Sequence, residues 1–251
     1  MSQQRREAIL LFLKNHNVAT VEQLVRVTAA SPATIRRDLI KLDKDGVIIR
    51  THGGVGLKDF IPFQPSTNEK MLKHIIEKER IAEYVSHLIV PGSSIVLDAG
   101  TTTLCLAKKL AHMPLRVITT DLHVALLLSE YKQIEVIITG GRVDNSSQSC
   151  IGSYGVNLLS NIYPDFAFVS CNSWSMEKGI TAPTEEKAYL KRALLKNAKR
   201  KIMVADSSKY GQCSLFCVVP LNELTDIITD NHLSSVAQNE MSGNNFILHL
   251  V

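Results

Sequence analysis

The chain has 251 residues, enough for one large domain or two domains of ordinary size. With 45% apolar and 21% charged residues, no apolar run of membrane-spanning length and a polar N-terminus, it is expected to be a cytoplasmic globular protein without a membrane partner. Residues 1–56 hold nine Lys/Arg against five Asp/Glu, so the whole net charge of +4 lies in this first quarter. Such segregation favours binding to a polyanion.

Two amphipathic helices are predicted before residue 31. Apolar residues between Ala8 and Leu13 repeat at helical spacing and mark the first helix. The second begins with the capping box Thr20–Gln23 and is expected to bury Leu24 and Val25. Two helices of this kind before a third, polar one form the pattern of a helix-turn-helix.

The third helix begins at Ser31, which can cap its free amides, and Pro32, which suits the first helical position. Ile35, Leu39 and Leu42 form its apolar stripe, which leaves a cationic opposite face suited to the major groove of DNA. An ordinary solvated helix is the alternative interpretation. The residues of this helix expected to face DNA are Ser31, Ala33, Thr34, Arg36, Arg37 and Lys41.

A short hairpin is predicted after this helix. Asp45-Gly46 marks a turn, residues 47–52 form a strand, and Gly53-Gly54 allows a tight reversal. Arg50 and His52 would then lie on a wing beside the phosphate backbone of double-stranded operator DNA. Residues 1–56 are therefore predicted to be a winged helix-turn-helix domain.

Residues 57–72 contain two prolines and no sustained periodicity, so they are predicted to be a linker, and residues 73–251 a second domain. This domain begins with a helix at about 73–88. Continuous apolar runs, separated by helical stretches, predict strands buried on both faces and hence a mostly parallel, doubly wound α/β sheet. The strands are expected at 94–98, 116–120, 135–139, 166–171, 201–205, 226–229 and 246–251.

Polar and small residues follow four of these strands, and such strand ends bind ligands in sheets of this class. The first strand end leads into a helix start that suits a phosphate, although an ordinary capped turn has the same composition. Lys209 is expected to pair with a phosphate, and Asp98 or Asp206 to accept hydrogen bonds from sugar hydroxyls. The candidate ligand residues are Asp98, Gly100, Thr101, Thr102, Thr103, Thr120, Asp121, Gly140, Gly141, Asp206, Ser208 and Lys209.

The chain resembles DeoR-type bacterial transcriptional regulators over essentially its full length. The N-terminal motifs are Thr-Ile-Arg-Arg-Asp-Leu at 34–39 and Arg-Thr-His-Gly-Gly at 50–54; the C-terminal ones include Asp-Ala-Gly-Thr-Thr-Thr at 98–103 and Asp-Ser-Ser-Lys-Tyr-Gly at 206–211. The resemblance implies a homo-oligomeric repressor, a dimer or tetramer, of a carbohydrate operon. It also implies a sensor domain similar in fold to ribose-phosphate isomerase, with a small phosphorylated sugar as effector.

Three positions depart from that family's pattern: Asp121, where Asn is common, Ser170-Cys171, where Gly is frequent, and Lys187, where a carboxylate is common. These departures concern the effector rather than DNA binding. Lys187 is expected either to add a second contact to an anion or to be a solvent-facing lysine of a helix.

An isomerase or deaminase of the same fold is the competing class of protein. The sequence shows neither a glutamate base after a glycine-rich loop nor a His paired with Asp-Glu, and an enzyme has no use for the basic N-terminal domain. A DNA-binding architectural protein would leave the polar strand ends unexplained. The five cysteines include no Cys-x-x-Cys pair, so neither a zinc site nor a disulfide framework is indicated. No catalytic residue, metal or cofactor is expected.

Overall fold

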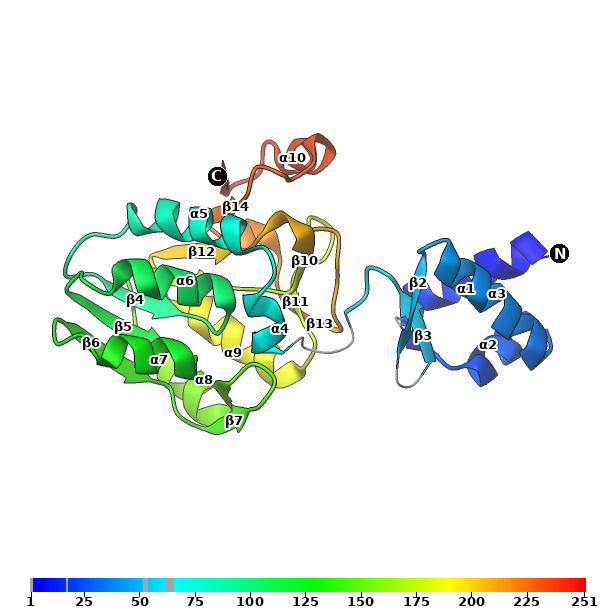
Figure 1. The fold of residues 1–251 in the computed structure, drawn as a ribbon, viewed down its shortest axis with the longest axis horizontal. Coiled ribbons are helices and arrows are strands. Elements are labelled where there is room, and N and C mark those ends of the chain that lie inside the picture. Colours follow the sequence, from blue (N-terminus) through cyan, green and yellow to red (C-terminus); the bar gives the residue numbers. More distant parts are fainter. Residues whose placement is uncertain (1, 17, 52–53, 62–65) are drawn as a thin grey trace. The chain divides into compact units, whose positions relative to one another are not determined.

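The computed structural model describes residues 2–16, 18–51, 54–61 and 66–251, and these form two compact units, residues 1–62 and 63–251 (Figure 1). The stretch 57–72, predicted to be a linker, contains parts of both units. The strand β3 continues to Leu57, and Thr67–Met71 is the helix α4, which begins with a capping box between Ser66 and Glu69.

The N-terminal unit is a winged helix-turn-helix, as predicted. Its strands pair antiparallel in the order β1-β3-β2, and its helices enclose a core that includes Ile9, Leu24, Ile35 and Ile48. The two-residue strand β1 is too short to carry a sequence pattern and was not predicted. The described elements are α1 (Ser2–His16), β1 (Val18–Ala19), α2 (Val21–Thr28), α3 (Pro32–Lys44), β2 (Ile48–Thr51) and β3 (Gly54–Leu57).

The C-terminal unit is a doubly wound α/β domain, as predicted. Its helices are α4, α5 (Ile75–Ser86), α6 (Thr101–Leu110), α7 (Leu122–Ser129), α8 (Ser153–Ser160), α9 (Glu185–Lys196) and α10 (Ser235–Met241), with the 3-10 turns η1 (Ser207–Lys209) and η2 (Leu221–Glu223). The strands of its main sheet are β4 (Ser94–Leu97), β5 (Leu115–Thr119), β6 (Ile134–Ile138), β9 (Phe166–Val169), β12 (Arg200–Val204), β14 (Asp226–Thr229) and β15 (Ile247–Leu250).

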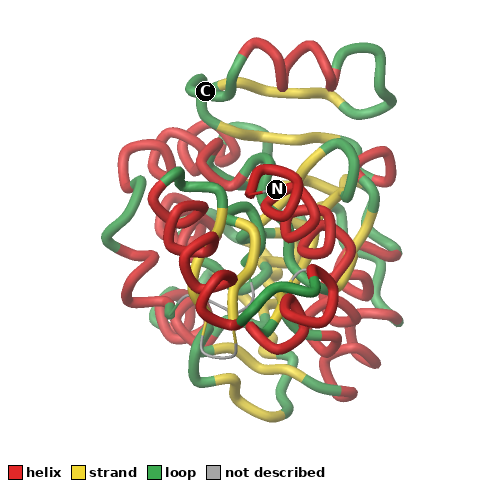
Figure 2. The backbone as a smooth tube through the Cα atoms, turned by 90° about the vertical axis from the view of Figure 1, so that its right-hand side faces the viewer, coloured by secondary structure: helices red, strands yellow, loops and turns green. Residues whose placement is uncertain are grey.

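In the described part of the chain these strands form a parallel sheet of seven, in the order β15-β14-β12-β9-β4-β5-β6. Each corresponds to a predicted strand. Figure 2 shows β15, which ends near the C-terminus, at one edge of this sheet. The chain runs from β4 to β5 and β6 in one direction and then returns to β9 on the other side of β4, so the topological switch point lies between β4 and β9. Ligands bind at such points, outside the carboxyl ends of the strands.

Helices cover both faces of the sheet. Successive residues of a strand face opposite sides, so a continuous apolar run packs against helices on both. On one face, Leu97 packs in a core with Leu106 of α6, together with residues of α5 and α7. On the other, Val96 packs in a second core with Leu194 of α9 and residues of α8. The apolar runs that predicted these strands are thus buried on both sides.

Five short strands outside the main sheet were not predicted. They form a hairpin of β7 (Arg142–Asp144) with β8 (Ser149–Ile151), and an antiparallel sheet of β10 (Ser173–Ser175), β11 (Gly179–Ala182) and β13 (Phe216–Val219). Segments such as Ser-Trp-Ser and Arg-Val-Asp have no apolar run and pair only because the surrounding fold brings them together. The hairpin and β11 matter because they form one side of the site described next.

Candidate functional site

The helix α3 has the features predicted for it. The hydroxyl of Ser31 accepts a hydrogen bond from the backbone N–H of Thr34 at 3.3 Å, and Ile35 and Leu39 are buried. Thr34 is partly exposed, and the other side chains of α3 predicted to face DNA are exposed on the opposite side: Ser31, Ala33, Arg36, Arg37 and Lys41. Three cations therefore lie on the open face of a capped helix, as contact with phosphates and base edges requires.

Asp38 supports this helix and was not singled out in the sequence. Its buried carboxylate accepts a hydrogen bond from the Arg5 guanidinium of α1 at 2.5 Å. The signal that identifies Asp38 is its position beside Ile35, Leu39 and Leu42 on the apolar stripe, where a carboxylate needs a partner. The pair holds α3 against α1.

Arg50 is exposed on β2, with its Nε 3.4 Å from Oδ2 of Asp43, and His52 lies outside the described residues. Gly54 was predicted to allow a chain reversal. The structure gives a further reason for glycine: φ is +154°, and a Cβ there would lie 2.1 Å from the carbonyl oxygen of Ala19. The close approach of β1 to β3 therefore excludes a side chain at this position.

The C-terminal unit has a cavity of about 590 Å³, including space open to solvent, at the switch point between β4 and β9. The predicted ligand residues that line it are Asp98, Gly100, Thr101, Thr102, Thr120 and Lys209. The wall also includes residues of α4, β11, α9, the β7–β8 hairpin and the loop after β9. Among them are Lys70, Ser147, Ser149, Ser170, Thr181, Lys187 and Lys191. The remaining predicted residues, Thr103, Asp121, Gly140, Gly141, Asp206 and Ser208, do not line it.

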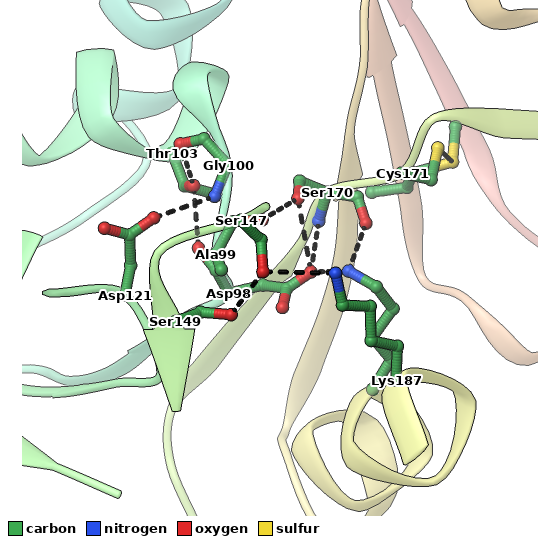
Figure 3. A network of polar contacts seen from close by, with 12 residues as sticks. Asp98, Ala99, Gly100, Thr103, Asp121, Ser147, Ser149, Ser170, Cys171 and Lys187 are labelled. Carbon is green, nitrogen blue, oxygen red and sulfur yellow. Dashed lines mark hydrogen bonds and ion pairs between the residues drawn. The ribbon is translucent and has the colours of Figure 1, made fainter. Parts of the chain in front are cut away.

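Asp98 forms the floor of the cavity and joins β4 to β9. Its carboxylate accepts hydrogen bonds from the N–H of Ser170 at 3.0 Å and the Ser170 hydroxyl at 3.3 Å (Figure 3). It also pairs with Lys191. Lys191 also donates to the carbonyl of Ser170 at 2.8 Å. Gly100 packs so closely that a Cβ would lie 2.5 Å from the Ser170 hydroxyl oxygen. Asp98 therefore has partners within the protein itself, whereas the sequence predicted it as an acceptor for sugar hydroxyls.

The start of α6 lies in the cavity wall. Gly100, its N-cap, has no side chain to satisfy the first-turn amides. The hydroxyls of Thr102 and Thr120 are buried and have no hydrogen-bond partner among the described residues. A buried hydroxyl without a partner is costly, so a ligand atom is expected to complete both. Together with the positive end of the helix, these groups suit an anion that accepts hydrogen bonds.

Four predicted residues lie outside the cavity lining. The Thr103 hydroxyl donates to the carbonyls of Asp98 and Gly100, both at 2.7 Å. Asp121 caps α7 and accepts from the Gly100 N–H at 3.1 Å (Figure 3); burial raises its pKa, against the effect of these amides. Gly140 and Gly141 follow β6, an edge strand two places from the switch point, so the predicted convergence of four strand ends does not extend to them.

Asp206 positions Lys209. Its buried carboxylate accepts a hydrogen bond from the Ser208 hydroxyl and lies 3.0 Å from Nζ of Lys209. Burial acts to raise the pKa of Asp206, but the Lys209 ammonium and the Ser208 hydroxyl outweigh it and lower the pKa. Asp206, predicted to contact sugar hydroxyls, is therefore occupied in holding Lys209 at the cavity.

Four lysines surround the cavity, and three of them have a carboxylate partner. The three pairs are Lys187 with Asp144 at 2.6 Å, Lys191 with Asp98, and Lys209 with Asp206 at 3.0 Å. Lys70 has no carboxylate within ion-pair distance in the part of the chain that the structure describes. Burial, followed by repulsion from the other three lysines, lowers the pKa of Lys70 to about 7. The site therefore has one more lysine than paired carboxylates, which favours an anionic ligand.

Lys187 is not a solvent-facing lysine, which was one of its two predicted roles. It is only 7% exposed, and its ammonium donates to the Asp144 carboxylate. It also donates to the Ser147 hydroxyl at 3.1 Å (Figure 3). Burial lowers its pKa, against the effect of Asp144. Burial in turn acts to raise the pKa of Asp144, but hydrogen bonds from Lys187 and Ser147 outweigh it and hold that pKa well below its usual range. Lys187 thus fixes the turn between β7 and β8.

Sequence reasoning missed several lining residues. Lys191 carried a signal, since it lies four residues after Lys187 on a predicted helix and thus on the same face. Lys70 fell in the predicted linker, where the capping box of Ser66 and Glu69 was the overlooked signal of a helix start. Ser147 and Ser149 fell in an unpredicted hairpin that has no such pattern.

Among the described residues, no group of three or more His, Cys, Asp or Glu side chains is placed to hold a metal ion. All five cysteines are free. None of the described helices is both long and apolar enough to cross a membrane.

Both parts of the chain match known families. Residues 5–59 match a DeoR-like helix-turn-helix domain and residues 73–231 the DeoR C terminal sensor domain. An HTH-type transcriptional regulator of Haemophilus influenzae is 37% identical over 99% of this chain and 97% of its own. The HTH-type transcriptional repressor GlcR of Bacillus subtilis is 36% identical over 91% and 88%. The glycerol-3-phosphate regulon repressor of Escherichia coli is 29% identical over 90% of each chain. These relatives are regulators, in agreement with the expectation that the chain is not an enzyme.

Proposed function

The chain belongs to the DeoR family of DNA-binding transcriptional regulators, and we propose that it represses a carbohydrate-metabolism operon under the control of a phosphorylated sugar or related metabolite. In this proposal α3 enters the major groove, where Arg36 and Arg37 contact base edges and phosphates. Arg50 contacts the backbone beside it. Binding takes place in the cytoplasm, where the operator DNA is found.

The observation that carries the effector proposal is the unbalanced charge of the cavity. Lys70 has no carboxylate partner among the described residues, and the wall adds the uncapped start of α6 and the buried hydroxyls of Thr102 and Thr120. A phosphate would supply both the negative charge and the acceptor oxygens that these groups lack. We place it near Thr101, facing Lys209.

The remainder of the cavity suits a small polyhydroxylated molecule. Ser149 presents a hydroxyl group in the cavity wall, beside the hydroxyl of Ser147, and it can exchange a hydrogen bond with a sugar hydroxyl. The Escherichia coli relative is named for the regulon of a phosphorylated metabolite, which supports the same class of effector.

The test begins with selection of DNA fragments from the source genome on the full-length protein, followed by footprinting. Bound fragments are then titrated with phosphorylated sugars and, as controls, with the same sugars without phosphate. We expect at least one phosphorylated sugar to change operator affinity while its unphosphorylated counterpart has no effect. Sequence-independent DNA binding, or equal responses to both forms of every sugar, would contradict the proposal.

A further inference from the structure

The helix α4 lies where the chain enters the C-terminal unit. The last strand of the N-terminal unit, β3, ends at Leu57, and α4 begins at Thr67. The short helix is nevertheless well anchored. The N–H of Thr67 donates to the carbonyl of Ser146 at 3.0 Å, and the buried Lys78 of α5 donates to the carbonyls of Lys70 and Lys73.

The first of these contacts connects α4 to the wall of the cavity. Ser146 belongs to the turn between β7 and β8, and its hydroxyl donates to the Asp144 carboxylate at 2.8 Å. Lys187 donates to the same carboxylate and to the hydroxyl of Ser147, which lines the cavity. The turn that supports the ligand site therefore also holds the start of α4.

The side chain of Lys70 is the contribution of α4 to the cavity itself. The groups that act on it are the ammonium groups of Lys209, Lys191 and Lys187 and the carboxylate of Asp98, which is already paired with Lys191. No carboxylate of the described residues pairs with Lys70. Among the protein's own groups Lys70 thus faces mainly like charge, and a bound anion would reverse that interaction.

We propose that Lys70 is the residue through which the C-terminal domain senses its bound anion and that α4, by pairing with it, passes ligand occupancy to the connection with the DNA-binding domain. This inference rests on the proposed function, because it assumes that the cavity binds an anion. In this proposal α4, and not the longer helix α5 that follows it, links the ligand site to the connection with the DNA-binding domain. Lys70 acts as a positioning residue, since its pairing with the anion fixes the helix that carries it.

A proton is expected to accompany this pairing. With its pKa lowered to about 7, Lys70 is largely neutral at higher pH, and an anion beside it raises that pKa. Between the two pKa values each binding event takes up a proton, so anion affinity falls as the pH rises. Inorganic sulfate is the suitable probe, because it does not titrate in this range and phosphate does.

The experiment measures sulfate binding to the full-length protein by calorimetry from about pH 6.5 to about pH 8.5, with hydrogen exchange of the amides of residues 66–71. The variants are Lys70→Met and Lys70→Arg. Lys73→Met is the matched control, since Lys73 is an exposed lysine one turn along that does not line the cavity. Lys209→Ala tests the anion site itself.

For the wild type and Lys73→Met we expect affinity that falls with rising pH and slower exchange in α4 when sulfate is bound. In Lys70→Met, the affinity for sulfate is expected to drop about tenfold at low pH and to lose its pH dependence. Sulfate should then no longer slow amide exchange in α4. Lys70→Arg should bind without pH dependence, because a guanidinium stays charged throughout. This variant keeps the test decisive even if Lys70→Met folds poorly.

A Lys70→Met variant with wild-type affinity and pH profile would overturn the inference, as would wild-type α4 amides whose exchange sulfate does not slow. If sulfate binding is lost in Lys209→Ala while Lys70→Met behaves as wild type, only the role of Lys70 is wrong. If sulfate does not bind the wild type, or binds Lys209→Ala equally well, the anion site of the proposed function fails as well.

Discussion

Arg36 and Arg37 are exposed and adjacent on α3, so they point in different directions from the helix axis. One is expected to contact a base edge and the other a phosphate. Alanine at the base-contacting position should weaken operator binding by about 1–3 kcal/mol. Alanine at the phosphate-contacting position should reduce the magnitude of the slope of log affinity against log salt concentration by about one. Titrations of operator and non-operator DNA at several salt concentrations separate the two.

Lys132→Ala is the control for these variants, because it removes one exposed positive charge from the C-terminal domain. It should bind operator as the wild type does. Wild-type operator affinity in the double variant Arg36→Ala, Arg37→Ala would show that α3 is not the recognition helix.

Lys70 also makes the stability of the empty protein depend on pH. Its pKa is about 7 in the folded protein and near the usual 10.5 in the unfolded chain, so the folded state binds fewer protons between these values. The cost of burying the charge is present in full below about pH 7 and is relieved as the pH rises toward 10. Lys70→Met should therefore raise the free energy of unfolding of the ligand-free C-terminal domain at pH 6 by more than at pH 9.

Urea denaturation in a sulfate- and phosphate-free buffer measures this difference. Lys73→Met should show no such pH dependence, since Lys73 is exposed. An equal effect of Lys70→Met at both pH values would mean that the Lys70 ammonium is not destabilised in the folded protein.

The wing depends on the close approach of β1 to β3 at Gly54. A methyl group at Gly54 would lie 2.1 Å from the Ala19 carbonyl oxygen, so the backbone must shift. Gly54→Ala is expected to destabilise the N-terminal domain by about 2 kcal/mol or more. Gly46→Ala, at φ +67° with its nearest neighbour 3.7 Å away, should cost only about 1 kcal/mol of left-handed backbone strain.

Thermal unfolding of the two variants, with operator binding as a second readout, tests whether Gly54→Ala is the more destabilising substitution. If Gly54→Ala is no less stable than Gly46→Ala, the packing of β1 on β3 does not hold the wing.

The main elements were predictable because each has a local signal. The strands of the main sheet are continuous apolar runs, and α3 begins with a capping Ser31 and Pro32. The hairpin of β7 and β8 has no such signal, because its strands pair through contacts that the rest of the domain supplies. The hairpin carries Ser147 in its turn and Ser149 at the start of β8, so one wall of the cavity was missed with it.

The site residues were likewise predictable only where the sequence has a local signal. Asp98, Thr101, Thr102 and Thr120 lie directly after strands, where topology alone places ligand residues. Asp206 also follows a strand, but its contact with Lys209 turns it away from the predicted role, and only side-chain packing decides this. Lys70 lies in a five-residue helix whose capping box, Ser66 with Glu69, signals a helix start, but a helix this short has no periodic pattern that would assign Lys70 to the site.

We expect the full-length protein to bind repeated or palindromic operator sites as a symmetric oligomer. A single winged helix-turn-helix buries too small a surface to select one site in a genome, and paired domains supply the missing affinity. Light scattering of the full-length chain should give a multiple of 27.8 kDa at working concentration. A mass of one chain together with full operator affinity would contradict this expectation.

The two domains are expected to communicate through differential affinity. If a phosphorylated effector prefers one state of the protein and the operator another, each must alter the affinity for the other by the same factor. The C-terminal domain must also gain stability as effector is added, by an amount that grows with the logarithm of its concentration.

The most direct test is operator affinity with and without a saturating phosphorylated sugar, measured for the wild type, Lys209→Ala and the control Lys132→Ala. The operator affinity of the wild type and of the control should change by the same factor when the sugar is added. Lys209→Ala, once circular dichroism shows that it is folded, should have the wild-type operator affinity without sugar, within about twofold, and should not respond to the sugar. A Lys209→Ala variant that still responds fully, or that loses operator affinity without any sugar present, would contradict the control of DNA binding by an anion in this cavity.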